Sequence, residues 1–307
     1  MKVFVLAPNE NWILDRIAEE WKGEYPDLTT DNPAEADIIW LLSAWTWHQI
    51  PLNVLEEKKV IASIHHITPS KFTKESLREF LMRDRFVDAY HVPCQGTKDF
   101  ISRITTKPIN VIGYWYNEEM WYPMDREESR ENLELPMDKI IIGSFQRDTE
   151  GHDLKTPKLE KGPDLFFDYV NSGFEKDKLL VLLGGWRRQY LIRRLEETGI
   201  QYKYFELAPL EKLKHMYSAC DLYIVSSRVE GGPQAALEAA AMKVPIISND
   251  VGMVSEVLDK NCIFDISDKK YMPTHEDVEN SYQKVQKFEL KTHVKEYKDM
   301  FVKLKGI

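Results

Sequence analysis

Residues 223–258 contain a strand, a loop, a helix and a second strand in immediate succession. An apolar run over 223–225 leads through two serines to Glu-Gly-Gly-Pro at 230–233, and an alanine-rich helical segment then precedes a second apolar run over 244–247. Neighbouring strands that are joined through a helix run parallel, because the crossover returns the chain to the edge where it started. This stretch therefore restricts the chain to α/β folds with a parallel sheet.

Strand-like and helix-like segments alternate along the rest of the chain as well. Short apolar runs predict the strands, and apolar residues at helical spacing predict the helices between them. Such alternation predicts parallel, doubly wound sheets. Besides the unit above, strands are expected at residues 2–7, 36–42, 59–64, 89–93, 109–112, 139–143, 179–184 and 201–205, and helices at 11–21, 70–83, 97–104, 163–171, 188–198, 210–219, 276–287 and 291–305.

A polar segment at 125–138 interrupts this alternation. A chain of 307 residues is long enough for two domains of ordinary size. We therefore expect a first Rossmann-like domain over residues 1–137 and a second over 138–290.

Composition and charge exclude several classes of protein. No apolar run approaches the ~18–20 residues of a membrane span, and the polar residues directly after the first strand are unlike a signal peptide. The net charge of −9, most of it in the first half, argues against nucleic acid as a partner and against docking on an anionic membrane. Three widely spaced cysteines, Cys94, Cys220 and Cys262, favour reduced thiols and a cytoplasmic location.

The Glu-Gly-Gly-Pro loop predicts a site for an anion. Gly231 and Gly232 let the backbone approach a ligand, Pro233 suits the first helical position, and the free amides at the start of the helix favour a phosphate. Gln234 and Glu238 are the polar residues early in this helix. Glu238 lies ~7–8 Å along the helix axis from Pro233, which is far enough to reach from a phosphate to a ribose.

The spacing of Glu230 and Glu238, with two glycines directly after the first glutamate, resembles the E-x7-E motif of retaining glycosyltransferases of family 4, the glycosyl transferases group 1. The resemblance implies the GT-B fold, in which two Rossmann-like domains face a central cleft and the last helix, about residues 291–307, packs back on the first domain. It also implies that Glu230 contacts hydroxyls of the donor sugar and that Glu238 binds the ribose of the nucleotide. Without the resemblance, the pair is read as a loop glutamate and a solvent-facing helix glutamate.

The resemblance continues at the opening of the second domain, where the family binds the donor diphosphate with an arginine and a Lys-Gly pair. Lys161 fits the lysine, and Arg147 takes the role of the arginine although an insertion separates the two. The alternative for Lys161 is an ordinary surface lysine, and the alternative for Arg147 is an interdomain salt bridge. In the interdomain segment, Gly113 and Tyr114 replace the Asn-Gly of the family.

Further candidates follow strands at their carboxyl ends, where open α/β sheets bind ligands. His65 follows the strand at 59–64, and the resemblance implies that it contacts the transferred sugar; His66 is the less favoured alternative. Gly185 and Trp186 end a strand of the second domain and are expected to bind the donor.

Seven of the eight tryptophans lie in the first 121 residues. Trp12, Trp45 and Trp47 come after strands, on the loop side of the sheet. An aromatic face there can stack on a pyranose, so we expect these three residues to bind the acceptor. The alternative for each is packing in the core, as for other large aromatic side chains.

The expected reaction follows from what a sugar nucleotide requires. It reacts by losing a nucleoside diphosphate, so the negative charge on the leaving phosphate must be stabilised. The sequence has no Asp-x-Asp motif for a metal, and the substitutes would be Arg147, Lys161 and the amides of Gly231 and Gly232. We therefore expect a retaining glycosyltransferase, without metal or other cofactor, that moves a sugar from a nucleotide-diphosphate sugar to a hydroxyl of a carbohydrate or glycoconjugate. The alternatives are a GT-B sugar-nucleotide epimerase and a non-catalytic homologue that binds a sugar nucleotide.

Overall fold

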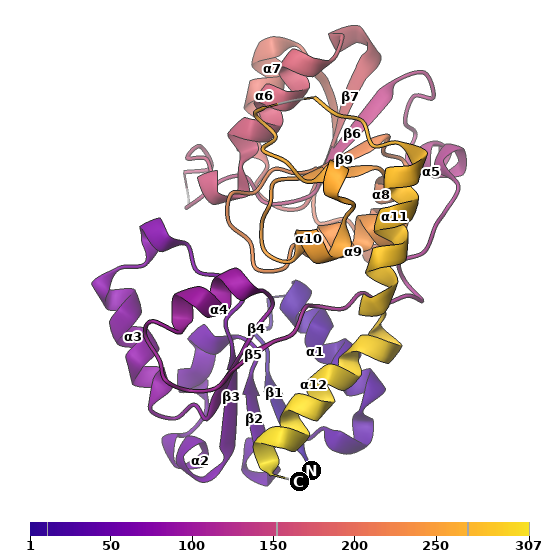
Figure 1. Cartoon of the computed structure of the whole chain (residues 1–307). Coiled ribbons are helices and arrows are strands. Elements are labelled where there is room, and N and C mark those ends of the chain that lie inside the picture. Colours follow the sequence, from indigo (N-terminus) through magenta and orange to yellow (C-terminus); the bar gives the residue numbers. More distant parts are fainter. Residues whose placement is uncertain (11, 152, 269, 307) are drawn as a thin grey trace. The chain divides into compact units, whose positions relative to one another are not determined.

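The computed structural model describes residues 1–10, 12–151, 153–268 and 270–306 (Figure 1). Two compact units are present: Met1–Asn117 together with Phe288–Ile307, and Glu118–Lys287. Each unit contains one parallel five-stranded sheet. The sequence placed the domain division at residue 137, whereas the second unit begins at Glu118. The residues between these two positions include helix α5 (Arg126–Asn132), which contacts α8 (Leu210–Ser218) of the second unit.

The first sheet has the strand order β1-β2-β3-β4-β5, which is the order of the strands in the sequence. All five strands lie at their predicted positions and all neighbouring pairs are parallel. Their carboxyl ends consequently lie at one edge of the sheet. The strands are β1 (Val3–Leu6), β2 (Ile38–Leu41), β3 (Lys59–Ser63), β4 (Ala89–Val92) and β5 (Ile109–Val111).

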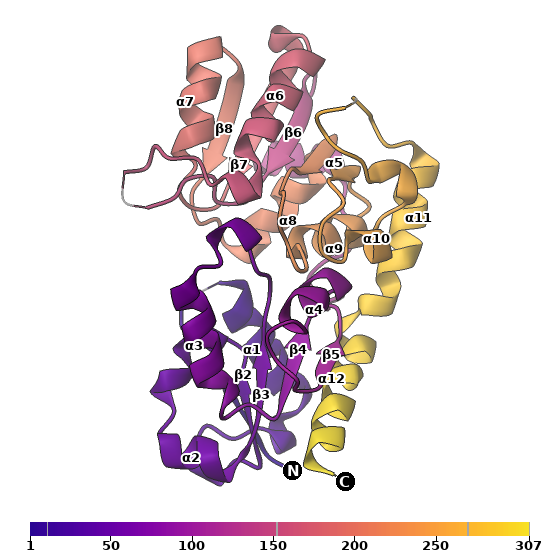
Figure 2. The same ribbon diagram turned by 60° about the vertical axis from the view of Figure 1, so that its left-hand side comes forward.

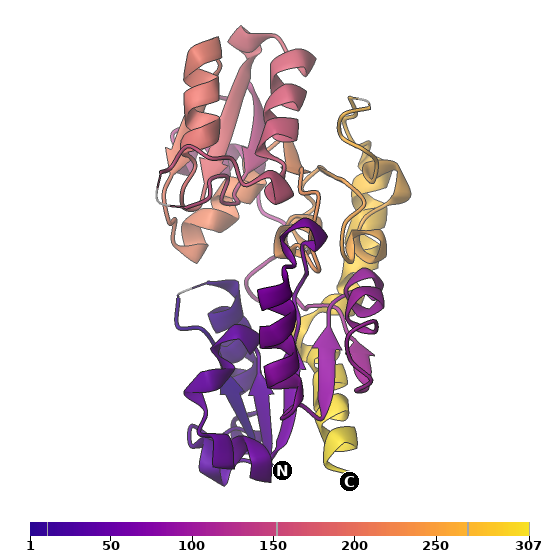
Figure 3. The same cartoon turned by 90° about the vertical axis from the view of Figure 1, so that its left-hand side faces the viewer.

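One face of the first sheet is covered by the helices that follow β2, β3 and β4 in the sequence (Figures 2 and 3). Side chains of these helices form a single apolar core with the strands, for example Val54, Phe80 and Ile101 with Ile39 and Leu41. The strands are buried on this face because the helices present their apolar sides to it. The helices are α2 (Leu52–Glu57), α3 (Lys74–Asp84) and α4 (Gln95–Ile101).

The other face carries α1 (Ile13–Glu24) and the C-terminal helix α12 (Leu290–Lys305). Three aromatic rings join these elements: Trp21 of α1, Trp40 of β2 and Phe301 of α12, with centroids 5.1 to 5.9 Å apart. The last helix therefore belongs to the core of the first unit. Residue 11, where the sequence placed the start of the first helix, lies outside the described residues.

The second sheet has the order β10-β9-β6-β7-β8, also parallel. The chain builds outward from β6 through β7 to β8 and then returns to the other side of β6 with β9. The point between β6 and β9 is a topological switch point, where open sheets bind ligands at the carboxyl edge. The strands are β6 (Ile140–Ser144), β7 (Leu179–Gly184), β8 (Gln201–Phe205), β9 (Leu222–Val225) and β10 (Ile246–Ser248).

The helices of the second unit match the predicted ones with two exceptions: the short helix after β10 was not predicted, and the polar segment at 125–138, which was expected to be a break, contains α5. Asp125 caps this helix by accepting a hydrogen bond from the Glu128 amide at 2.8 Å. Arg130 is buried and donates to Asp221 Oδ2 at 2.6 Å, next to the end of α8. The other helices are α6 (Pro163–Gly173), α7 (Gln189–Thr198), α8 (Leu210–Ser218), α9 (Gln234–Ala241), α10 (Val254–Val257) and α11 (His275–Val285).

None of the helices in the described part of the chain combines the length and the apolar character that a membrane span requires.

Candidate functional site

The Glu-Gly-Gly-Pro loop lies between β9 and α9, at the switch point of the second sheet. The helix begins at Gln234 with Pro233 as its N-cap, one residue later than predicted. Neighbouring backbone approaches the loop closely: a Cβ on Gly252 would lie 2.2 Å from the Gly231 carbonyl oxygen, and Gly252 has a φ of +57°. Only glycine fits there, because the position combines left-handed backbone with direct contact.

Lys161 and Glu230 form an ion pair at this loop, with 2.5 Å between Lys161 Nζ and Glu230 Oε1. Ser227 Oγ donates to the same glutamate oxygen at 2.8 Å. Gln146, which follows β6, donates to the Lys161 carbonyl oxygen at 2.9 Å. The structure thus brings two predicted residues into direct contact and surrounds them with loops that follow β6 and β9.

Ser227 and Gln146 are site residues that the sequence reasoning missed. Ser227 lies three residues before Glu230, and Gln146 lies directly before Arg147. Both are polar residues within the two loops already singled out. Their position beside known candidates was the available signal, but the contacts themselves depend on the fold.

The insertion between Arg147 and Lys161 closes on itself. The chain forms an antiparallel bridge between Thr149 and Pro157, and the Lys158 amide donates to the Asp148 carbonyl at 2.8 Å. We call residues 148–151 and 153–158 the insertion hairpin. Because its two ends are adjacent, the insertion leaves Gln146 in contact with the backbone of Lys161.

A buried ion pair anchors the insertion hairpin. Asp148 accepts from Arg188 Nε at 3.2 Å, and both side chains are buried. Asp148 also accepts from the amides of Tyr190 and Leu191 in the first turn of α7, and Arg188 donates to the carbonyls of Ser144 and Gly184. Burial raises the pKa of Asp148, and the Arg188 charge opposes that rise.

Glu238 lies within α9 and is 4% exposed, so the solvent-facing alternative is wrong. Its Oε2 accepts a hydrogen bond from the Tyr217 hydroxyl at 2.9 Å. The Tyr217 ring packs against Phe145 and Tyr223, with centroids 4.9 and 5.1 Å away. Burial raises the pKa of Tyr217 well above its usual value, so the phenol stays a hydrogen-bond donor. The ribose contact of Glu238 stays a prediction.

Gly185 and Trp186 follow β7 at the same edge of the second sheet. Gly185 has a φ of +86°, and a Cβ there would lie 2.9 Å from the Phe145 carbonyl oxygen, so this turn favours glycine. Trp186 is exposed, and the guanidinium carbon of Arg187 lies 4.1 Å from its ring centroid. An indole face is thus available beside the loop that follows β6.

His65 follows β3, at the carboxyl edge of the first sheet. Its Nε2 lies 2.7 Å from the Leu42 carbonyl oxygen, and its Nδ1 is hydrogen-bonded to the Tyr114 hydroxyl. A carbonyl only accepts, so Nε2 carries the proton and Nδ1 accepts from Tyr114. Burial lowers the pKa of His65 to about 4, which keeps the ring neutral at pH 7. Both ring nitrogens therefore have partners within the first unit, and the contact with a sugar stays a prediction.

The three tryptophans assigned to the acceptor differ in exposure. Trp12 is 42% and Trp45 is 52% exposed, and the Trp45 ring lies edge-on to His65 at 6.3 Å. Trp47 is 8% exposed and packs against Phe86 within the core of the first unit. The core alternative is therefore the one that the structure supports for Trp47, whereas Trp12 and Trp45 present free surface.

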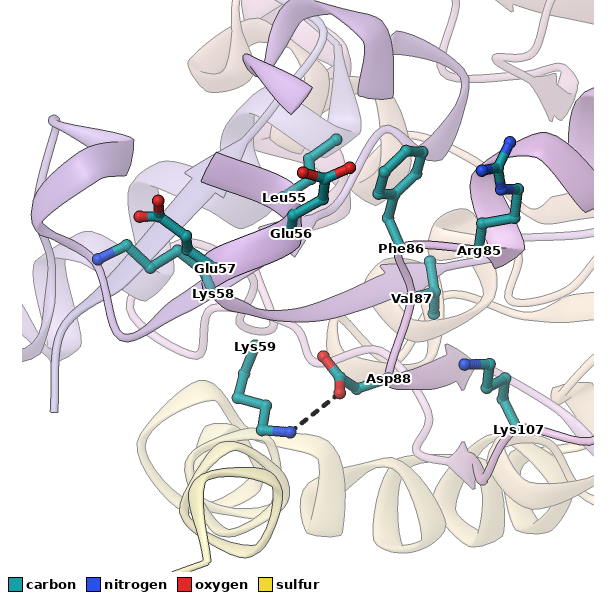
Figure 4. Close-up of a pocket in the computed structure, with 10 residues that line it drawn as sticks. All are labelled: Leu55, Glu56, Glu57, Lys58, Lys59, Arg85, Phe86, Val87, Asp88 and Lys107. Carbon is teal, nitrogen blue, oxygen red and sulfur yellow. Dashed lines mark hydrogen bonds and ion pairs between the residues drawn. The ribbon is translucent and has the colours of Figure 1, made fainter. Parts of the chain in front are cut away.

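A separate hollow of about 390 Å³ lies at the opposite, amino-terminal edge of the first sheet (Figure 4). Its walls carry charges of both signs, and Lys59 and Asp88 pair within it at 3.0 Å. None of the predicted site residues contributes to it. The lining residues are Leu55, Glu56, Glu57, Lys58, Lys59, Arg85, Phe86, Val87, Asp88 and Lys107.

Comparison with known proteins agrees with this geometry. Residues 125–300 match the family described as glycosyl transferases group 1. The O-antigen biosynthesis glycosyltransferase WclY of Escherichia coli is 26% identical over 140 residues, which are 45% of this chain and 36% of that protein. The lipopolysaccharide core biosynthesis mannosyltransferase LpsB of Rhizobium meliloti is 26% identical over 144 residues, 44% of this chain and 38% of that protein. The matches thus span well under half the length of these relatives.

Solved structures share the fold over almost the whole chain. Anabaena Alr3699/HepE, in complex with UDP-glucose, superposes with a TM-score of 0.79 at 13% identity and covers 98% of this chain and 99% of its own. Sucrose-phosphate synthase from Thermosynechococcus elongatus gives a TM-score of 0.67 at 17% identity, over 97% of this chain and 80% of its own. The fold is GT-B, and since the family match covers more than half of the residues, the chain belongs to the glycosyl transferases group 1 family.

Proposed function

We propose that this protein is a retaining glycosyltransferase that moves a sugar from a nucleoside-diphosphate sugar to an acceptor hydroxyl. The observation that carries the proposal is the Lys161–Glu230 ion pair at the switch point of the second sheet. A cation for a phosphate and a carboxylate for sugar hydroxyls lie side by side there, next to the amino end of α9.

The pair has a different task in each state of the site. Without donor, Glu230 neutralises Lys161, which limits the cost of holding two largely buried charges. With donor bound, Lys161 Nζ turns to the diphosphate and Glu230 accepts hydrogen bonds from the sugar. The charge that develops on the leaving phosphate is then held by Lys161, Arg147 and the first amides of α9. The acceptor approaches on the face that the leaving group vacates, and a phosphate oxygen helps to take its proton.

The names of the relatives support a donor and an acceptor class. HepE was solved with UDP-glucose, and WclY and LpsB are named for O-antigen and lipopolysaccharide core synthesis. We accordingly infer a UDP-sugar as the first donor to test and a growing glycan or glycoconjugate as the acceptor. Trp12 and Trp45, both exposed, are the proposed acceptor platform of the first unit.

Metal independence is part of the proposal, because cationic side chains and helix amides can take the role that a divalent ion has in other transferases. Turnover in excess EDTA is therefore expected to stay within about twofold of the untreated rate. A loss of activity that added Mn²⁺ or Mg²⁺ restores would contradict the assignment of the leaving-group contacts.

A panel of nucleotide sugars tests the function. UDP-, GDP-, ADP- and dTDP-sugars are compared for thermal stabilisation, slow hydrolysis and transfer to glycan acceptors, with product configuration read by NMR. One donor should stabilise the protein and give a product with the anomeric configuration of the donor. An inverted product would contradict retention, an isomerised nucleotide sugar formed without acceptor would indicate an epimerase, and binding without any turnover would indicate a non-catalytic homologue.

A further inference from the structure

Arg187 occupies a constrained position at the carboxyl end of β7. Its φ of +57° lies in the left-handed region, which is unfavourable for a residue with a side chain. Its backbone carbonyl accepts from the Asp148 amide at 3.2 Å and from Thr149 Oγ1 at 3.1 Å. Its Nη1 donates to the Gly151 carbonyl at 2.8 Å. The insertion hairpin therefore holds both the backbone and the side chain of Arg187 in place.

The guanidinium of Arg187 keeps hydrogen-bonding capacity that the protein leaves unused. One face stacks on Trp186 at 4.1 Å, and Nε is buried without a partner among the described residues. An unsatisfied buried donor is costly, and such groups occur where a ligand completes the hydrogen bonding.

Arg147 lies close enough for the two positive charges to repel. Burial and the charge of Arg187 together lower the pKa of Arg147, and the charges of Glu150 and Glu160 oppose this effect. Within the described part of the chain, neither arginine forms an ion pair with a carboxylate, and Arg147 uses only Nε, in a bond to the Thr149 carbonyl at 2.7 Å. Two half-buried guanidinium groups that form no ion pair with a carboxylate of the described residues favour an oxyanion as their partner.

The loops place this pair beside the proposed donor site. Arg147 directly follows Gln146, which contacts the backbone of Lys161, and Arg187 follows the next strand of the same sheet edge. We propose that Arg187 is a second diphosphate-binding guanidinium, which acts with Arg147 on the phosphate oxygens of the donor and is positioned by the insertion hairpin. This inference rests on the proposed function and adds a residue, and a role for the insertion, that the E-x7-E motif does not contain.

Binding of UDP and of uridine, measured by calorimetry, separates a phosphate contact from a structural role. Arg187→Gln should weaken UDP binding about 10- to 100-fold, as expected for the loss of charge-assisted hydrogen bonds, and should leave uridine binding within about twofold. Arg187→Lys should have a UDP affinity between that of the wild type and that of Arg187→Gln. Arg194→Gln is the matched control, because Arg194 stacks on Phe167 at 4.2 Å in the same unit, and its UDP affinity should not change.

A second measurement uses the wild-type protein in case Arg187→Gln does not fold. Phenylglyoxal modifies accessible arginines, and mass spectrometry reports the modification of Arg187. UDP should protect Arg187 and uridine should not.

Equal losses of UDP and uridine affinity, an unchanged UDP affinity, or protection by both ligands or by neither would overturn the assignment of Arg187. Failure of the wild type to bind any nucleoside diphosphate of the panel would instead overturn the proposed function. The two failures are thus distinguishable.

Discussion

At the carboxyl edge of the second sheet the predicted site residues include an ion pair, whereas at that of the first sheet they are a neutral histidine and three tryptophans. In the second unit, Lys161 and Glu230 contact each other directly. In the first unit, both ring nitrogens of His65 form hydrogen bonds within the protein, to Leu42 and Tyr114. Of the tryptophan candidates, two are exposed and one is buried in the core. One edge therefore presents an assembled charged site, whereas the other presents single side chains.

The difference follows from the residue types. Charges that are largely removed from water require a partner, so a lysine and a glutamate in two loops of one sheet edge tend to find each other. A tryptophan is stable both as a core residue and as an exposed platform, and only the packing of the neighbouring helices decides. Sequence patterns are consequently more informative about the donor edge than about the acceptor edge.

The largest expected effect separates the core tryptophan from the surface tryptophan at the carboxyl edge of the first sheet. Trp47→Ala should lower the free energy of unfolding by about 3–5 kcal/mol, because it empties a core position against Phe86. Trp45→Ala should change it by less than about 0.5 kcal/mol, because its ring is half exposed. Urea unfolding of both variants measures the contrast. A larger loss for Trp45→Ala than for Trp47→Ala would reverse the assignment of core and surface.

Lys161→Ala tests whether the charged pair of the second edge acts in catalysis. Removing one stabiliser of the leaving phosphate should lower kcat about 10²- to 10³-fold. Lys155→Ala is the matched control, since Lys155 is an exposed lysine of the insertion hairpin, and its kcat should equal that of the wild type. Melting temperatures of both variants report whether folding is preserved. Equal kcat values for a folded Lys161→Ala and the control would remove Lys161 from the reaction.

The pH dependence of stability sharpens the account of His65. Its pKa is about 4 in the folded protein against 6.5 in the unfolded chain, so between these values the unfolded chain binds a proton that the native state does not. The free energy of unfolding should therefore fall as the pH drops from about 6.5 to 4, by on the order of 2 kcal/mol from this residue. Burial also lowers the pKa of His91, which adds a loss in the same direction.

His65→Gln isolates the contribution of His65 from that of His91. Unfolding by urea at several pH values should show a shallower decline for the variant than for the wild type. Identical declines would mean that the His65 ring is not held neutral by its surroundings.

The strands and most helices could be predicted from the sequence, because apolar runs and helical periodicity depend on local residues. Helix α5 could not, since its sequence is polar and Asp221, the partner of its buried Arg130, lies far away in the sequence. The insertion hairpin was also beyond sequence reasoning. Its course depends on the buried pair of Asp148 and Arg188, whose partners lie on two different strands and a helix.

The candidate site likewise has features that the sequence predicted and features that depend on contacts between distant residues. The roles proposed for Lys161 and Glu230 came from motif spacing, and the structure brings the two together. The burial of Glu238 against Tyr217 and the involvement of Ser227 were not visible, because both depend on contacts between elements distant in sequence.

The central claim is that the donor binds at the carboxyl edge of the second sheet, and Trp186 reports on it directly. In a spectrum of the ¹⁵N-labelled indole groups, with the Trp186 signal assigned from Trp186→Phe, saturating UDP should shift or broaden that signal, because the ring lies exposed beside the proposed diphosphate site. A Trp186 signal that stays unchanged at saturation, while the signals of Trp12 or Trp45 in the first unit move, would contradict the account.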